Sequence, residues 1–327
     1  MPQSAFLSRA GFIRKRARTR RLVWTILLLA LFFFSRTASG QVESPSQWLA
    51  FNRAGAPNSS LQCFMPGNIT VLGGELMITT RKQSAVCSSY DLPSASHAYT
   101  SGFLAMRSFR FLYGTVVVRA KFGGGTGTGS WPVIWMLDAG CQASDPTGTD
   151  DCNGQEIDIA EILKSDFTHV NQQIHVDNLA HNDGCIAATP DTSRNFHEYR
   201  LTWSPGSLVY AIDGMTTCII TRSYIPNAPM YLKISVHVGS YGGPVDDSSL
   251  PWTTLVDYVA VTQGSTVIFR DDFKSASTIM AGPESVNKAS RASGFSLNRA
   301  RATWLLSGLV LLFVAGAAVP LARRGRS

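Results

Sequence analysis

Three carboxylates, Glu156, Asp158 and Glu161, occur within a span of six residues. The first two alternate with isoleucines, and this period of two predicts a half-buried β-strand with acids on one face and apolar side chains on the other. Strict alternation would bring Ala160, not Glu161, to the acidic face. A β-bulge near Ile159 adds the one residue that returns Glu161 to the side of the other two acids.

Three carboxylates on one strand face repel one another, so the arrangement is electrostatically costly. It is expected where the face is fully solvated, or where a working site uses the acids and their shifted pKa values for chemistry. The segment alone leaves both interpretations open. The elements that would surround this strand therefore have to decide between them.

Short segments with strand character recur on both sides of the acidic strand, separated by glycine, proline and aspartate turns. The predicted strands are 69–72, 75–80, 101–103, 111–122, 131–137, 170–176, 196–203, 208–212, 216–221, 230–238 and 255–261. Residues from 41 to about 66 read as irregular, and no segment is a convincing amphipathic helix. This pattern predicts an all-β fold, an antiparallel sandwich of two sheets.

The net charge of +7 is unevenly distributed. Residues 1–40 carry eight basic residues and no acid, and residues 276–327 carry seven basic residues and one acid. Residues 41–275 carry 14 basic and 21 acidic residues, a formal charge of −7. The basic character belongs to the two ends, so we expect the folded part to bind no nucleic acid.

Residues 1–40 have the organisation of a signal peptide. A basic segment at 14–21 precedes an apolar run at 22–34, and small residues suited to cleavage follow before Gln41. The apolar run is short for a membrane span, and an uncleaved signal anchor is the alternative. We therefore expect export from the cytoplasm.

Residues 303–322 are apolar and long enough to span a membrane, and the basic tail 323–327 is expected to stay cytoplasmic. A glycolipid-anchor signal and a sorting segment removed after export are the alternatives. The polar, small residues of 276–302 read as a linker. All three alternatives place the folded part outside the cell, at the cell surface.

Six cysteines lie within 41–275, an even number in an exported segment, and this predicts disulfides. None of them forms a C-x-x-C pair, so a metal site is not expected. The predicted pairings join nearest neighbours, with Cys141–Cys152 bracketing a loop before the acidic strand, although fifteen connectivities are formally possible.

The segment Glu156–Glu161 resembles the E-x-D-x-x-E signature of glycoside hydrolase family 16, in the bulged form of its laminarinase-like members. Further motifs occur in the order in which the family has them over 69–261. They are Tyr113-Gly114 with Arg119 and Lys121, the run 129–137, His175, Phe196–Tyr199 with Trp203–Pro205, Tyr210–Gly214 and Val256–Val259. The resemblance implies a concanavalin-like β-jelly roll of two curved antiparallel sheets over 41–275, with sugar bound in a concave cleft.

By the same resemblance, Glu156 is the nucleophile of a retaining glycosidase and Glu161 is the general acid/base. Asp158 corresponds to the assisting acid of the family, which shares a proton with the nucleophile. We expect the three acids to titrate as a coupled unit, with Glu161 protonated until it donates.

The resemblance assigns substrate binding to Trp131, Trp135 and His175. The two tryptophans correspond to a sugar platform and cleft wall, and packing in the core is the alternative for both. His175 corresponds to a cleft histidine that hydrogen-bonds substrate or Glu161, and a structural role is the alternative. No cofactor is expected, although Asp257 occupies a position that touches a structural calcium in some members.

These expectations favour an endo-acting hydrolase of β-1,3- or mixed β-1,3/1,4-glucan, monomeric and with a polysaccharide as its partner. The alternatives are a cell-wall transglycosylase, a hydrolase of galactans such as agar or carrageenan, and a glucan-binding module without activity. Three departures from the family pattern, Ala160, His237 and Tyr241, lie near the predicted cleft. They leave the sugar specificity open and do not affect the predicted chemistry.

Overall fold

The computed structural model describes residues 47–55, 60–88, 94–106, 108–138, 155–176, 180–274 and 279–284. The predicted signal peptide, membrane segment and basic tail lie outside these ranges, and so does the predicted Cys141–Cys152 bridge. Within the described ranges, no helix has the length and apolarity to cross a membrane.

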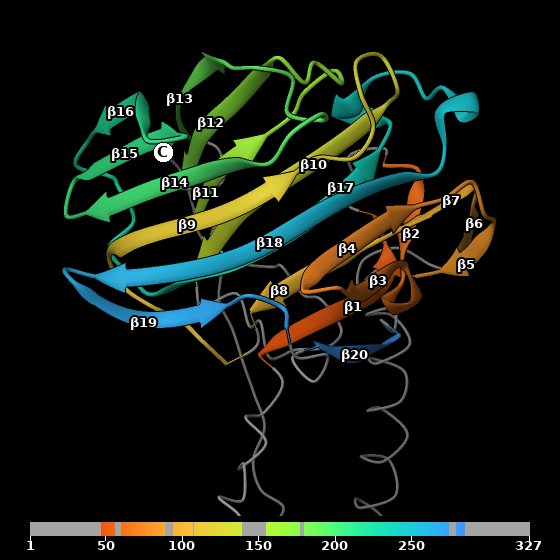
Figure 1. Ribbon diagram of the computed structural model, residues 1–327, viewed down its shortest axis with the longest axis horizontal. Helices are drawn as coiled ribbons and strands as arrows, with labels where there is room; N and C mark the ends of the chain where they lie inside the picture. The colour runs from red at the N-terminus through yellow and green to blue at the C-terminus, as the bar shows by residue number, and fades with distance from the viewer. Residues whose placement is uncertain are drawn as a thin grey trace, which may run out of the picture. The chain divides into compact units, whose positions relative to one another are not determined.

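The described residues form two large β-sheets packed face to face (Figure 1). The first sheet has ten strands in the order β13-β12-β11-β10-β17-β8-β1-β2-β7, with β20 beside β1. Its strands are β13 (His181–Ala188), β12 (His169–Val176), β11 (Glu156–Glu161), β10 (Ser130–Asp138), β17 (Met230–Val238), β8 (Phe103–Met106), β1 (Trp48–Ala54), β2 (Gln62–Phe64), β7 (Tyr99–Ser101) and β20 (Ile279–Glu284).

The second sheet has eight strands in the order β16-β15-β14-β9-β18-β4-β3, with β19 beside β18. Its strands are β16 (Met215–Thr221), β15 (Ser207–Ile212), β14 (His197–Ser204), β9 (Gly114–Lys121), β18 (Trp252–Gln263), β4 (Glu75–Thr80), β3 (Ile69–Leu72) and β19 (Thr266–Asp271). A separate hairpin pairs β5 (Ala85–Cys87) with β6 (Ala95–His97). The predicted all-β sandwich is confirmed.

Alternating side chains close the core between the sheets. On β14, Tyr199, Leu201 and Trp203 are buried, whereas the intervening residues reach the surface. The strand β17 is buried along its whole length, because its core face packs between the sheets and its other face is covered too. That other face carries a lysine, a serine and a histidine, which bear on the site below.

The segment 41–66, predicted to be irregular, contains β1 and β2, so that expectation is wrong. Almost every residue of β1 is buried, on both faces of the strand. A strand buried on both sides shows no period of two, and its sequence does not reveal it. Two strand pairs, β2–β7 and β1–β20, are parallel within the otherwise antiparallel first sheet. The strand β20 lies within the predicted linker 276–302.

Two disulfides join neighbouring cysteines along the chain, as predicted: Cys63–Cys87 and Cys185–Cys218. The second bridge links β13, at the edge of the first sheet, to β16, at the edge of the second. It therefore ties the two layers together beside the strands that carry the acids.

Candidate active site

The strand β11 carries all three acids on one face of the first sheet, which we call the site face. On the neighbouring β10, Val133 pairs with Glu161 and Trp135 with Asp158. Between these pairs β10 advances by two residues and β11 by three, and β12 shows the same slip. This is the predicted β-bulge. It is confirmed, and it is the reason that Glu161 lies on the site face.

The carboxyl group of Glu161 lies between two side chains from the adjacent strands. The indole Nε1 of Trp131 donates to Oε1 at 2.9 Å, and the amide Nε2 of Gln173 donates to Oε2 at 3.3 Å. Only 8% of Glu161 is exposed. Both carboxyl oxygens are thus oriented by strands that flank β11.

Asp158 contacts both Glu156 and His175. Its Oδ2 lies 3.3 Å from Nε2 of His175, and the opposite ring nitrogen of His175 contacts Oδ1 of Asn182 at 2.6 Å. A hydrogen bond also connects Asp158 to Glu156. The amide oxygen of Asn182 can only accept, so Nδ1 of His175 carries a proton and the ring is held in place.

Burial raises the pKa of all three acids. The pKa of Glu161 rises to about 7 through desolvation, although the Trp131 hydrogen bond opposes the shift. Desolvation and then the charge of Asp158 raise the pKa of Glu156 to about 8. Desolvation raises the pKa of Asp158 to about 6, and the hydrogen bond from His175 offsets part of that rise. Protons therefore remain in this cluster at neutral pH.

The proton between Glu156 and Asp158 belongs to the pair. The two carboxyls are hydrogen-bonded and repel each other when both are ionised, so they titrate together. The bond with Asp158 raises the pKa of His175 to about 9, and the histidine is cationic at neutral pH. The charge of His175 favours the ionised forms of Glu156 and Asp158.

Two polar residues of β17, Ser235 and His237, contact the two tryptophans. Nε1 of Trp135 donates to Oγ of Ser235 at 3.2 Å, and that oxygen lies 3.1 Å from Nε2 of His237. The His237 ring lies against Trp131, with ring centroids 4.4 Å apart. Burial lowers the pKa of His237 to about 3, so it stays neutral. His237 thus packs against the indole that holds Glu161.

Lys233 places a buried cation beside these aromatic rings. Its Nζ lies 4.2 Å from the Trp135 ring centroid and 4.9 Å from that of Phe103. Lys233 pairs with Trp135 across the β10–β17 ladder, and Trp135 pairs with Asp158 in turn. Its charge lowers the pKa of Glu156 and so opposes the effect of burial on that acid.

The structure brings the six predicted site residues together on neighbouring strands of one sheet. Trp131 is almost fully buried and bonds an acid, whereas Trp135 is partly exposed. His175 contacts Asp158, where the expected partner was substrate or Glu161. Tyr241 is 58% exposed and meets the Trp131 ring edge-on.

Sequence reasoning missed four polar residues that contact or influence the predicted site residues, namely Gln173, Asn182, Lys233 and Ser235. Gln173 precedes His175 by two residues, so a predicted strand at 170–176 would place both on one face. That signal was available. The position of Lys233 depends on the pairing of β17 with β10, across about a hundred residues of sequence, and has no local signal.

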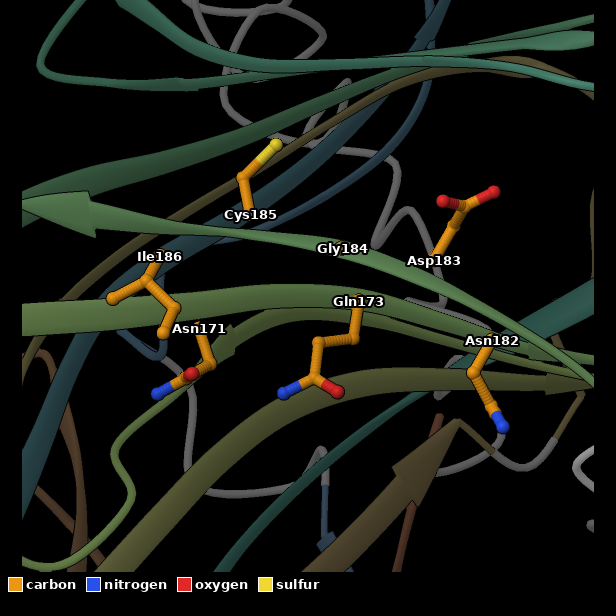
Figure 2. A pocket seen from close by; sticks show the side chains of 7 residues that line it. All are labelled: Asn171, Gln173, Asn182, Asp183, Gly184, Cys185 and Ile186. Carbon is orange, nitrogen blue, oxygen red and sulfur yellow. The ribbon is translucent and has the colours of Figure 1, made fainter.

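A pocket of about 370 Å³ opens on the same face, over β12 and β13 (Figure 2). The side chains of Asn171, Gln173, Asn182 and Ile186 extend to one side of the strand pair, and those of Asp183 and Cys185 to the other. Gln173, which lines this pocket, also bonds Glu161, so the pocket lies next to that acid.

Asp257, the position that touches calcium in some members, pairs with Arg119 at 2.5 Å. Among the described residues, Asp257 belongs to no group of three potential metal ligands. Glu156, Asp158 and His175 do bring three ligand atoms within 4.8 Å of one another. The hydrogen bonds between them, and the cationic state of His175, already account for their approach.

A comparison of sequences places this site within a known family. The family described as "Glycosyl hydrolases family 16" matches residues 64–259. A keratan-sulfate endo-1,4-β-galactosidase of Sphingobacterium multivorum is 28% identical, over 68% of this chain and 52% of that protein. A β-glucanase of Rhodothermus marinus is 29% identical, over 59% of this chain and 70% of that protein. The chain thus spans about half of the first relative.

Solved structures give the same result for the fold. The catalytic domain of an endo-1,3-β-glucanase (laminarinase) from Thermotoga petrophila superposes with a TM-score of 0.58 at 25% identity. The superposition covers 68% of this chain and 93% of that domain. The two-sheet sandwich described above is therefore that of the family.

Proposed function

Because the chain belongs to glycosyl hydrolases family 16, we propose that it is a retaining, endo-acting hydrolase of β-1,3- or mixed β-1,3/1,4-glucan. The observation that carries the proposal is the bulged strand β11. It presents two glutamates and an aspartate together, with hydrogen-bonding partners from both neighbouring strands. A solvated acidic face would have neither the burial nor the partners.

In the first step, Glu156 attacks the anomeric carbon, and the bond from that carbon to the leaving oxygen breaks. Glu161 donates its proton to that oxygen, so the departing sugar leaves as a neutral alcohol. The raised pKa of Glu161, about 7, keeps that proton available near neutral pH.

Glu156 has to be ionised to attack, although its pKa is raised to about 8. The hydrogen bond with Asp158 provides the route, because the shared proton can move to Asp158 as Glu156 forms its bond to carbon. The cations of His175 and Lys233 favour the ionised pair. Asp158 therefore assists the nucleophile.

In the second step, water attacks the anomeric carbon of the glycosyl-enzyme. Glu161, now ionised, takes a proton from the water, and the bond to Glu156 breaks. Two inversions at the same carbon return the β-configuration. The indole N–H of Trp131 donates to Glu161 in both steps. This hydrogen bond is stronger to the carboxylate than to the acid, so it stabilises Glu161 after the proton has been donated.

Relatives support glucan as the substrate. The Rhodothermus marinus protein is named a β-glucanase, and a protein of Niallia circulans that is 28% identical is named a glucan endo-1,3-β-glucosidase. The name of the Sphingobacterium multivorum relative favours a second candidate, a galactose-containing glycan. Transfer to a sugar in place of water would make the same site a transglycosylase.

We also propose that the folded part works outside the cytoplasm, tethered through 303–322 and without a partner chain. The basic and apolar segments at both ends support this proposal, as do the two disulfides, which persist in oxidising compartments. Protease treatment of intact cells that express the full chain should remove the activity. Activity that withstands protease treatment of intact cells, and is lost to the protease only after lysis, would contradict the proposed location.

The substrate proposal is tested by incubating the protein with laminarin, lichenan, agarose, carrageenan and keratan sulfate, and by following the products. Glucan oligosaccharides of several lengths, released first as the β-anomer, are expected. Release from a galactan alone would replace the substrate proposal, and lengthened oligosaccharides would indicate transfer. Binding without cleavage would contradict an enzymatic function.

A further inference from the structure

We propose that His237 is a positioning residue for Glu161: its ring holds the indole of Trp131 in the orientation in which that indole donates to the acid. The inference rests on the role proposed above for Glu161 as general acid and base. His237 is one of the positions at which the chain departs from the family pattern. From the sequence we expected this departure to leave the chemistry unaffected, and the contacts of His237 indicate the opposite.

Two rings support the indole of Trp131. The His237 ring lies against it, with ring centroids 4.4 Å apart and an interplanar angle of 32°. The Tyr241 ring meets it edge-on, with centroids 5.0 Å apart. Tyr241 is 58% exposed, whereas His237 is 7% exposed. A side chain packed in the interior moves less than one at the surface, so the buried histidine is the firmer of the two supports.

The His237 ring is itself fixed by three contacts. Its Nε2 lies 3.1 Å from Oγ of Ser235, and its Nδ1 lies 3.4 Å from Oγ of Ser60. The Phe64 ring packs edge-on against it, with centroids 5.0 Å apart. His237 and Ser235 belong to β17, whereas Phe64 belongs to β2 and Ser60 precedes that strand. The ring is therefore fixed between two elements.

The hydrogen bonds of Ser235 determine which nitrogen of His237 carries the proton. The indole N–H of Trp135 donates to Oγ of Ser235, and an indole N–H can only donate. Ser235 is fully buried, and among the described residues the remaining partner of its hydroxyl is Nε2 of His237. The hydroxyl therefore donates to Nε2, because a buried donor is rarely left unpaired. The proton of the neutral ring then lies on Nδ1, toward Ser60.

His237 is uncharged at neutral pH. Burial, and then the nearby cations Arg53 and Lys233, lower the pKa of His237 to about 3. The titratable groups whose charges act on Glu161 are different ones, namely Glu156, Asp158 and His175. His237 thus brings no charge to Glu161, and its influence passes through Trp131.

The hydrogen bond from Trp131 favours the ionised form of Glu161. An N–H bonds a carboxylate more strongly than a carboxylic acid, so this bond lowers the pKa of Glu161 and opposes the effect of burial. Without the support of His237 the indole is less well oriented and the bond weakens. Glu161 then keeps its proton to a higher pH, and the carboxylate that forms as the leaving group departs is less stable.

The experiment compares the full chain with its variants His237→Gln and His237→Phe. Glutamine offers Ser235 an acceptor but gives Trp131 no ring, whereas phenylalanine gives the ring without the acceptor. The protein is labelled at the indole nitrogens, and the Trp131 signal in the NMR spectrum is assigned with Trp131→Phe. That signal follows the ionisation of Glu161, because the N–H bonds its carboxyl group. The other indole signals show whether each variant is folded.

We expect the midpoint of this titration to rise by about half a pH unit to one unit in His237→Gln. It should stay near the wild-type value in His237→Phe, which keeps the ring. The alkaline limb of the pH profile of glucan cleavage should move with the midpoint, because that limb reports the deprotonation of Glu161. The acidic limb, which belongs to Glu156 and Asp158, should stay in place.

His181→Gln is the matched control, because the His181 ring lies against Tyr224, with centroids 4.5 Å apart, and does not support Trp131. It should leave the Trp131 midpoint unchanged. An equal shift in His237→Gln and His237→Phe, or a shift in neither, would overturn the proposal. The indole titration needs no turnover, so a wild-type protein that cleaves no polysaccharide would refute the proposed function and would leave the titration to decide the role of His237.

Discussion

At the scale of single residues, Glu156 and Glu161 have different surroundings, which suit different tasks. Glu161 is buried against an indole and an amide, and its pKa is raised to about 7 mainly by desolvation. Glu156 shares a proton with Asp158 and lies within reach of two cations, His175 and Lys233. A neutral acid and an acid that can give up its proton locally are what a retaining mechanism requires.

The first prediction concerns Glu161→Gln. Cleavage of a glucan, whose leaving group needs a proton, should fall by about 10²- to 10⁴-fold. An aryl glycoside with an acidic phenol needs no proton, so its first step should be much less affected. Added azide needs no general base, and it should accelerate turnover and yield a β-glycosyl azide. Product analysis checks this, and the absence of any azide effect would argue against the assigned role.

The same substitution should change the pH dependence of stability. The pKa of Glu161 is near its ordinary value of 4.5 when unfolded and about 7 when folded, so the folded state binds the proton more tightly. Stability is then lost as the pH rises from about 4.5 through 7. Urea unfolding should show that Glu161→Gln gains stability over the wild type across this window, by at most about 3 kcal/mol. A constant difference from pH 4.5 to 8 would contradict the raised pKa.

How far the residues of the site can be predicted depends on whether their signal is local. The three acids are recognisable because they lie within six residues of one strand. His237 and Lys233 contribute through contacts with Trp131 and Trp135, which exist only once β17 pairs with β10. A lysine in an apolar strand gives no indication from sequence that it will lie near a carboxylate.

At the scale of elements, the bulge in β11 fixes the geometry of the site. On β12 the partners of Asp158 and Glu161 are Gln173 and Asn171, two residues apart. The bulge therefore places Glu161 at the position along the sheet that Ala160 would take in a regular strand. The extra residue enters the core side, where Ile159 and Ala160 are both fully buried.

Deletion of Ala160 should consequently be tolerated. It restores strict alternation, keeps the three acids on one face and leaves the pairs with β12 unchanged. We expect a folded protein whose activity stays within roughly 10²-fold of the wild type. Deletion of Ile157 is the control, because it turns Glu156 to the core and should abolish activity. Circular dichroism tests whether each deletion variant is folded, and a glucan assay measures its activity. If both variants fold and both are inactive, the claim that the register of β11 determines activity is wrong.

Elements were predictable where one face of a strand meets solvent. The hairpin of β3 and β4 and the strand β14 show the period of two and were located within a few residues. The strand β1 is buried on both faces, and β13 contains a glycine and several polar residues, so neither shows that period. The missed strand β13 is also the one that builds the pocket.

At the scale of the whole molecule, the Cys185–Cys218 bridge connects the pocket strand β13 to the second sheet. Its cysteines are 33 residues apart, a separation for which loop closure accounts for about 4 kcal/mol. Replacing both cysteines by serine should lower the melting temperature by roughly 10 °C. It should also reduce glucan cleavage, because β13 lines the pocket together with Gln173, which bonds Glu161.

The matching replacement of Cys63 and Cys87 should lower the melting temperature as well, without that loss of glucan cleavage, because this bridge joins β2 to β5. Scanning calorimetry and a glucan assay provide the comparison. An equal loss of glucan cleavage in both double variants would show that the bridges act on overall stability alone.

The most direct test of the account is to locate the covalent intermediate. A 2-deoxy-2-fluoro β-laminaribioside with a good leaving group should inactivate the protein, because the fluorine slows both steps and the good leaving group accelerates only the first. Peptide mass spectrometry should then find one glycosyl group on Glu156. A label on another residue, or inactivation that persists in Glu156→Gln, would contradict the assignment of the nucleophile. Release of the α-anomer as first product would contradict the retaining mechanism itself.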